Sequence, residues 1–236
     1  MPVPEASTDW QYLPDAAAVA AAATALILSA ADAAIAARGE FRLVLAGGTT
    51  PDKVYRQLGT TQADWAHWQI YFSDERCLPP TNPERNSRMA AMAWLDQGGI
   101  PLQNVHPIPA ELGPQAAAQQ YARQVAAARP FDLVLLGMGE DGHTASLFPG
   151  HAHPSGEQVH AINDAPKPPP ERVSLSRDAL SDSCDVLILV TGAGKREAVR
   201  RWRAGEDLPI THITARNHLR VLVDHAASSG AAARDR

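Results

Sequence analysis

A continuous apolar run, Phe131 to Leu136, leads directly into a glycine-rich segment that ends at Gly150, and few folds accommodate such a sequence. A strand with one face in water alternates apolar and polar residues, whereas a strand covered on both faces is apolar throughout. The run therefore predicts a buried strand of a parallel sheet. Ligands bind beyond the carboxyl ends of such strands, and the sequence places Glu140, Asp141 and His143 there.

Three other apolar runs end in segments rich in glycine or charge: Phe41 to Ala46 before Gly47-Gly48-Thr49-Thr50-Pro51, Trp68 to Ser73 before Asp74-Glu75-Arg76, and Cys184 to Val190 before Thr191-Gly192-Ala193-Gly194-Lys195. Strands are also expected at Val105 to Ile108, Val159 to Ile162, Arg172 to Leu175 and Leu219 to Val223. Helical patterns occur at 16–37, 52–58, 114–128 and 196–203. This alternation predicts an α/β fold with a mainly parallel sheet, covered by helices on both faces, in a single doubly wound domain over residues 1–236.

The segment from Gly137 to Gly142 formally matches the dinucleotide-binding pattern G-x-G-x-x-G. Glu140 and Asp141 occupy variable positions of that pattern, where they would repel a pyrophosphate. Pro149 then ends any helix after about one turn, so the βαβ context of the pattern is missing. We therefore expect no nucleotide, and no other cofactor.

Asp141, Gly142 and His143 carry the predicted chemistry. A histidine with an ordinary pKa of about 6.5 can accept a proton from water at neutral pH. Asp141 can orient the imidazole, and Gly142 lets the backbone approach a ligand closely. The chain has no G-x-S-x-G segment that would supply a serine nucleophile. For an ester substrate we therefore expect direct attack by water, with His143 as the general base.

Gly47, Gly48 and Thr49 offer backbone N–H and hydroxyl donors where a helix begins, and the positive end of that helix faces the same place. The same residues are compatible with an ordinary tight turn, because the Walker lysine is missing. Lys195 stands at an equivalent strand end, either as a point charge for a phosphate or as a solvated lysine at a helix start. The residues alone leave these alternatives open.

Arg76 follows the second strand, where side chains of neighbouring parallel strands meet, and its guanidinium suits a phosphate or a developing oxyanion. Glu75 is expected to belong to a solvated turn. Cys77 is expected to pack as a small hydrophobic residue rather than to act as a nucleophile.

A metal site is not expected. The spacing of His151 and His153, with His160 as a third residue, suggests ligands, but no carboxylate or cysteine stands at ligand spacing. Cys77 and Cys184 lie far apart without a C-x-x-C pair, which argues against both a zinc site and a disulfide framework.

Several segments together resemble the 6-phosphogluconolactonases, which are relatives of the glucosamine-6-phosphate deaminases. They are GMGEDGHTASLFPG at 137–150, AGGTTP at 46–51, SDERCLP at 73–79, NSRMA at 86–90, and a segment at 166–172 similar to P-K-P-P-x-R. The deaminases share D-G-H but continue toward F-N-E-P, whereas this chain has Ser146-Leu147-Phe148-Pro149. That difference favours the lactonase branch. The family usually has threonine where Ser174 and Ser176 stand here.

The resemblance implies hydrolysis of 6-phospho-D-glucono-1,5-lactone to 6-phospho-D-gluconate in the oxidative pentose phosphate pathway. The residues that it implies, together with those argued above, are for catalysis His143, Asp141 and Arg76, and for substrate or phosphate binding Gly47, Gly48, Thr49, Asp74, Arg88, Gly142 and Lys195. Which arginine contacts the phosphate and which the carbonyl oxygen stays open.

The net charge of -5 argues against a nucleic-acid partner. No basic residue precedes the Ala-rich segment at 16–37, and Asp15 and Asp32 bracket only 16 uncharged residues, mostly alanine. We therefore expect neither a signal peptide nor a membrane span. The expected location is the cytoplasm, the expected partner is the small-molecule lactone, and the chain is expected to be a monomer or a small homo-oligomer.

Two other functions compete with the lactonase. An aminosugar-phosphate deaminase–isomerase is disfavoured by the missing F-N-E-P continuation. A non-catalytic sugar-phosphate-sensing module is disfavoured by the absence of a DNA-binding segment and by the intact D-G-H, which binding alone would not need.

Overall fold

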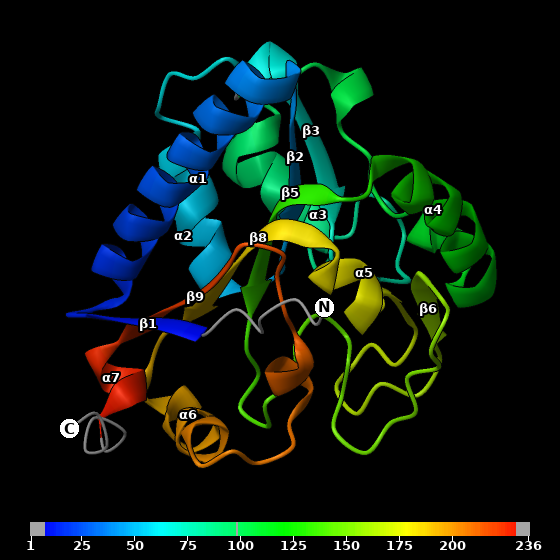
Figure 1. Ribbon diagram of the computed structural model, residues 1–236. Coiled ribbons are helices and arrows are strands. Elements are labelled where there is room, and N and C mark those ends of the chain that lie inside the picture. Colours follow the sequence, from blue (N-terminus) through cyan, green and yellow to red (C-terminus); the bar gives the residue numbers. More distant parts are fainter. Residues whose placement is uncertain (1–7, 98, 230–236) are drawn as a thin grey trace, which may run out of the picture.

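The computed structural model of the protein describes residues 8–97 and 99–229. Six parallel strands form the central sheet in the order β1-β9-β8-β5-β2-β3 (Figure 1). In chain order they are β1 (Thr8–Leu13), β2 (Phe41–Leu45), β3 (Trp68–Phe72), β5 (Phe131–Gly137), β8 (Ser183–Val190) and β9 (His218–Asp224). The predicted α/β fold with a mainly parallel sheet is confirmed.

Strand β5 lies between β2 and β8, which explains its apolar sequence. Leu133 is in register with Leu43 of β2, and Leu135 with Leu187 of β8. All side chains from Phe131 to Leu136 are buried. The charged member of the run, Asp132, accepts a hydrogen bond from the backbone N–H of Arg42 and pairs with Arg38, so that its charge is not buried alone.

Helices α1 (Ala16–Arg38) and α2 (Thr49–Leu58) pack together over one face of the sheet, and α4 (Pro114–Ala128) and α5 (Arg177–Ser181) lie on the other side (Figure 1). The remaining α-helices are α3 (Asn86–Ala90), α6 (Arg196–Arg203) and α7 (His225–Ser228). A π-helical segment, Ala91–Leu95, extends α3, and 3₁₀ turns occur at Trp65–His67, Leu102–Asn104, Ala110–Leu112, Ala193–Lys195 and Pro209–His212.

Helix α1 begins at Asp15, whose carboxylate accepts hydrogen bonds from the N–H groups of Ala17 and Ala18, both at 2.9 Å. This satisfies two of the free donors at the helix start. By length and hydropathy alone α1 could cross a membrane, but the buried core helix of a globular domain meets the same criteria. In the structure its apolar residues, such as Val19 and Ile27, are buried, as in the core helix of a globular domain.

A second, antiparallel sheet was not predicted. It consists of β4 (Asp74–Arg76), β7 (Arg172–Leu175) and β6 (Val159–Ile162), in that order. Asp74-Glu75-Arg76, expected as a loop, is therefore a strand that pairs with β7. The N–H of Leu175 donates to the carbonyl of Ser73, which joins this sheet to the end of β3.

One further expectation was wrong, and one strand was not predicted. Val105 to Ile108 is not a strand, because only Val105 forms a bridge, to Ile70 of β3. Strand β1 was not predicted, because it is short, begins with the polar residues Thr8 and Asp9, and lies at the sheet edge, where it pairs with β9. Trp10 of β1 packs edge-on against Trp202 of α6, with ring centroids 4.7 Å apart.

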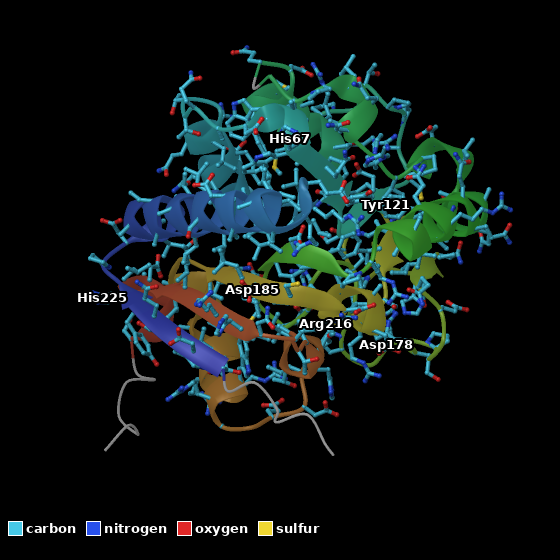
Figure 2. The ribbon with its side chains drawn as sticks, turned by 45° about the horizontal axis from the view of Figure 1, so that its top comes forward. His67, Tyr121, Asp178, Asp185, Arg216 and His225 are labelled. Carbon is cyan, nitrogen blue, oxygen red and sulfur yellow. The ribbon has the colours of Figure 1, made fainter. Side chains whose placement is uncertain are left out.

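The direction of the strands fixes where the site lies. In Figure 2, Asp185 and Arg216 mark the end of the sheet where β8 begins, and His225 marks the opposite end, just beyond β9. Because β2, β3, β5 and β8 are parallel, their carboxyl ends meet at the same edge. The four segments that follow them are therefore close together in space.

Candidate active site

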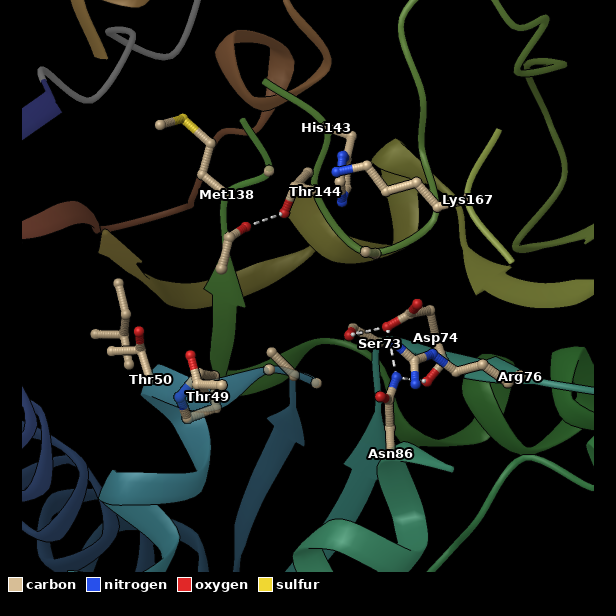
Figure 3. A pocket seen from close by; sticks show the side chains of 18 of the residues that line it. Thr49, Thr50, Ser73, Asp74, Arg76, Asn86, Met138, His143, Thr144 and Lys167 are labelled. Carbon is tan, nitrogen blue, oxygen red and sulfur yellow. Dashed lines mark hydrogen bonds between the residues drawn. The ribbon is translucent and has the colours of Figure 1, made fainter. Parts of the chain in front are cut away.

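A cavity of about 350 Å³ lies at this edge of the sheet (Figure 3). Its walls come from the segments that follow β2, β3, β5 and β8, together with Asn86 at the start of α3 and the extended segment that contains Lys167. The volume is within the range of small-molecule sites. Figure 3 shows His143 and Lys167 on one side of the cavity, and Thr49, Asp74 and Arg76 on the other.

His143 and Asp141 form the titratable pair that the sequence predicts. Nδ1 of His143 lies 2.5 Å from Oδ1 of Asp141, and the backbone N–H of His143 donates to the same oxygen at 3.2 Å. The second contact is a local turn of the Asx type, which the spacing of two residues allows. Since Nδ1 is engaged by the carboxylate, Nε2 is the ring nitrogen left for a ligand.

Burial lowers the pKa of His143 below its ordinary value, although Asp141 acts in the opposite direction. Burial raises the pKa of Asp141, but the attraction and hydrogen bonds of His143 together outweigh this, so that the pKa of Asp141 is lowered. At neutral pH the pair is therefore a carboxylate and a neutral imidazole. Nδ1–H donates to Asp141, and Nε2 is free to accept a proton, as a general base requires.

Two glycines fix the turn around this pair. A Cβ on Gly139 would lie 2.0 Å from Nδ1 of His143, so the imidazole packs directly on the glycine backbone. Gly142 has φ +86°, and a Cβ there would meet Leu208 at 2.9 Å. Gly142, which was predicted to bind substrate, is not among the residues that line the cavity.

The other predicted donors surround the start of α2. Gly47, Gly48 and Thr49 line the cavity, and the positive end of the ten-residue helix α2 points into it. The hydroxyls of Thr50 and Thr191 lie 2.6 Å apart and tie the start of α2 to the segment that follows β8.

Two lysines also line the cavity. Lys195 is half-buried, and burial lowers its pKa while Glu140 raises it. Lys167 reaches the cavity from the extended segment before β7, with Nζ 3.6 Å from Glu140. Glu140 thus lies close to the ammonium groups of both lysines.

A buried hydrogen-bond network holds Asp74. Its Oδ2 accepts from the hydroxyl of Ser146 at 2.7 Å, and its Oδ1 accepts from Ser73 and from the Asn86 amide, both at 3.1 Å. Asn86 in turn fills the space beside Gly47, where a Cβ would lie 2.1 Å from its Oδ1. The network therefore joins the segments after β2, β3 and β5.

Arg76 lines the cavity as predicted. Its Nη1 donates to the carbonyl of Glu84, and its Nε is buried without a hydrogen-bond partner among residues 8–97 and 99–229. The expectation for Glu75 was wrong. Glu75 is fully buried, and its carboxylate accepts from the backbone N–H groups of Arg76, Asn86 and Ser87 at 2.7–2.9 Å.

The structure does not bring Arg88 to the cavity. Arg88 lies on α3, and its Nη1 is 3.3 Å from Asp96 at the surface. Several lining residues were not predicted as site residues, and among them Asn86, Lys167 and Arg172 carry amide or charged side chains. The one sequence signal for Lys167 and Arg172 was the segment similar to P-K-P-P-x-R, and Asn86 had none beyond its place in NSRMA.

The described residues contain no group of three or more histidine, cysteine, aspartate or glutamate side chains that could hold a metal ion. His160 pairs with Glu157 at 2.9 Å, and His151 lies 3.6 Å from Asp164. Burial raises the pKa of Cys77 to about 11, which disfavours the thiolate that a nucleophile requires.

Comparison with known proteins is consistent with this site. Residues 14–223 match the family described as glucosamine-6-phosphate isomerases/6-phosphogluconolactonase. The chain is 36% identical over 243 residues to 6-phosphogluconolactonase of Mycobacterium tuberculosis, covering 94% of this chain and 98% of the relative. It is 34% identical to that of a Nostoc species, covering 93% and 96%. The crystal structure of 6-phosphogluconolactonase from Thermotoga maritima superposes with a TM-score of 0.86 at 28% identity, covering 92% of this chain and 100% of that one.

Proposed function

The chain belongs to the family of glucosamine-6-phosphate isomerases and 6-phosphogluconolactonases, and we propose that it hydrolyses 6-phospho-D-glucono-1,5-lactone to 6-phospho-D-gluconate. It is an enzyme of the lactonase type, as are the relatives described above. The observation that carries the mechanism is the His143–Asp141 pair, which presents a neutral imidazole to a cavity lined with anion-binding groups.

His143 acts as the general base in the proposed reaction. Nε2 takes a proton from a water molecule, whose oxygen attacks the carbonyl carbon of the lactone. Asp141 stabilises the imidazolium that forms. The tetrahedral intermediate then collapses, the bond to the ring oxygen breaks, and His143 returns its proton to that oxygen, which becomes a hydroxyl group. Water is consumed and no other reactant is needed.

Arg76 stabilises the oxyanion in this proposal. Its side chain lines the cavity near Asp74 and carries a permanent positive charge. Donors directed at a developing oxyanion contribute on the order of 100-fold or more to the rate in comparable sites.

The phosphate of the substrate binds at the start of α2. Thr49, Thr50 and the helix N-terminus supply donors, and Lys195 and Lys167 supply charge. The hydrogen bond between Thr50 and Thr191 joins the start of α2 to the segment that carries Lys195, which supports a shared role of the helix start and this lysine in binding the dianion. Binding energy from this remote group can then be used at the reacting carbon.

The deaminase alternative is disfavoured at one position. Where the deaminase continuation F-N-E-P has a glutamate, this chain has Phe148, whose ring lies 4.8 Å from the His143 ring. An apolar ring at this place supplies no carboxylate for acid–base chemistry on an aminosugar. The sensing-module alternative would not require the paired Asp141 and His143.

We also propose that the enzyme functions in the cytoplasm as one domain. Both cysteines are free and only partly buried, which suits a reducing compartment.

The test is an assay with purified protein. Freshly generated 6-phosphogluconolactone should be hydrolysed well above its spontaneous rate, as followed by acid release, while glucosamine 6-phosphate should release no ammonia. Ammonia release without lactone hydrolysis would favour the deaminase. Binding of 6-phosphogluconate without either reaction would favour the sensing module.

A further inference from the structure

Phe148 lies apart from the main hydrophobic core. It is 1% exposed and packs in a small separate cluster with Ile162 and Ala165. Its ring centroid is 4.8 Å from that of His143, with the two planes inclined by 47°. The Phe148 ring is therefore buried outside the main core and contacts the proposed base directly.

Arg172 lies against the same phenyl ring. Its guanidinium is 5.6 Å from the Phe148 centroid, within the range of a cation–π contact. Arg172 is itself held by hydrogen bonds to the carbonyls of Lys167, Pro168 and Pro169, at 2.9–3.2 Å. The backbone carbonyl of Phe148 accepts from the N–H of His151 at 3.3 Å and lies 3.1 Å from Nε2 of His153. Both the ring and the backbone of Phe148 are therefore held in place.

The imidazole of His143 is confined by these neighbours. The Gly139 backbone leaves no room for a Cβ beside Nδ1, Asp141 holds Nδ1, and the Phe148 ring contacts the imidazole ring. Rotation of the imidazole would break the contact with Asp141 or collide with one of the other two residues.

We propose that Phe148 is a positioning residue for lactone hydrolysis, whose ring acts with the Gly139 backbone to hold the His143 imidazole with Nε2 directed to the substrate. The proposal rests on the role of His143 as the general base. A base held at a fixed angle to the attacking water saves orientational entropy at the moment of reaction.

The Phe148 ring also keeps water from one side of the imidazole. The charged groups that act on His143 are Asp141 beside it, Lys167 on the extended segment and Asp74 on β4, and Arg172 lies at the Phe148 ring. Burial is the largest influence on the pKa of His143, and Phe148 supplies part of that burial. Its removal would admit water, stabilise the imidazolium and raise the pKa of His143 toward the ordinary value.

Phe148→Leu is the variant that tests this. Leucine keeps the position apolar, but it is smaller than phenylalanine and lacks the flat ring that contacts His143, so that water can reach the imidazole. We expect kcat to fall by roughly 10- to 100-fold, the loss typical of a misplaced catalytic group, with KM nearly unchanged. The acidic limb of kcat/KM should move to higher pH. Phe41→Leu is the matched control, because Phe41 is equally buried but packs against Trp68 in the main core. It should lose stability while keeping kcat and the pH profile.

Nuclear magnetic resonance of the histidine rings gives a readout that does not depend on turnover. The His143 signal is identified by its disappearance in His143→Asn. In Phe148→Leu its titration should move to higher pH, and in the wild-type protein its ring protons should show Overhauser contacts with Phe148. The wild-type measurement holds even if Phe148→Leu does not fold.

Three results would overturn the proposal. Wild-type protein without Overhauser contacts between the two rings would remove its structural basis. An unchanged His143 titration and an unchanged kcat in Phe148→Leu would reduce Phe148 to a packing residue. If His143 titrates as expected but His143→Asn retains full lactonase activity, the general-base assignment fails, and the catalytic meaning of the contact fails with it.

Discussion

Glu75 does not line the cavity, but its hydrogen bonds fix residues that do. Its carboxylate is fully buried and caps the start of α3 by accepting from the N–H groups of Asn86 and Ser87. Nε of the buried Arg85 lies 3.4 Å from the same carboxylate, and Arg85 pairs further with Glu111 at 2.8 Å. Arg76 and Asn86, which both line the cavity, are thereby fixed relative to each other.

Replacing Glu75 with glutamine should therefore be costly. Glutamine removes the negative charge opposite Arg85. Its NH₂ group would also face backbone N–H groups, which then lose their hydrogen-bond acceptor. Breaking a buried ion pair typically costs about 3–5 kcal/mol, so we expect a loss of that order in the free energy of unfolding, measured in urea. Glu84→Gln, at an exposed position of the same segment, should change it by less than about 0.5 kcal/mol. Equal losses in the two variants would contradict this account.

The residues of the site differ in how readily the sequence identifies them. Asp141 and His143 contact each other across two positions, so local spacing was sufficient to predict the pair. Asn86 reaches Asp74 and Gly47 only through the fold, and no local pattern indicates that. Glu75 was misjudged because a charged triplet after a strand is usually solvated, and its partner Arg85 lies ten positions further along.

At the scale of elements, α2 and the segment after β8 combine to form the proposed phosphate site. The helix contributes its N-terminal N–H groups, and Lys195 contributes a charge that a dianion would stabilise. Neither element alone distinguishes a phosphate site from an ordinary turn. Because α2 and the segment after β8 both lie at the same edge of the sheet, a phosphate site is supported.

Lys195→Met should therefore affect the phosphorylated substrate selectively. A hydrogen bond to a charged group contributes about 1.5–3 kcal/mol, which corresponds to a loss of roughly 10- to 100-fold in kcat/KM for 6-phosphogluconolactone. Hydrolysis of unphosphorylated gluconolactone should be poor in the wild type and nearly unchanged in the variant. Lys53→Met on the exposed side of α2 is the control and should alter neither substrate. Equal losses on both lactones would place Lys195 outside the phosphate site.

Helices and strands were predictable where their own sequence has a clear apolar pattern. Strands β2, β3, β5 and β8 are apolar because both faces are covered, so their sequences were decisive. Strands β6 and β7 were predicted with the bounds that the structure has. Strands β1 and β4, and the pairing of β4, β7 and β6 in a separate sheet, were not predicted, because these strands are short or mixed in pattern and pair with distant segments. The extended segment with Lys167 has no regular pattern, and its place at the cavity follows only from the fold.

For the whole molecule, the chain carries a net charge of -5, whereas its cavity gathers Arg76, Lys167, Arg172 and Lys195. The local potential at the site is therefore opposite in sign to the overall charge, which suits a small anionic substrate. The enclosing segments come from the length of chain between β2 and α6, so that the cavity forms only when the fold brings these distant segments together.

Catalysis should be independent of metal ions, since the proposed base and oxyanion donors are side chains. Prolonged treatment with a chelator, followed by its removal, should leave lactonase activity unchanged. Activity that is lost on this treatment and restored by zinc would contradict the assignment of His151 and His153 as bystanders.

The central claim is that His143 is the general base of a lactonase, and the pH dependence of kcat/KM tests it most directly. The imidazole must be neutral to act, and burial lowers the pKa of His143. In the wild type, kcat/KM should therefore rise with pH through one ionisation below the ordinary histidine value of about 6.5, after correction for spontaneous opening of the lactone. In His143→Asn that ionisation should vanish and the rate should fall by roughly 100- to 10,000-fold, while 6-phosphogluconate still binds. If His143→Asn kept its activity and its pH profile, the base would have to be Asp141 or Glu140, and the mechanism proposed here would be wrong.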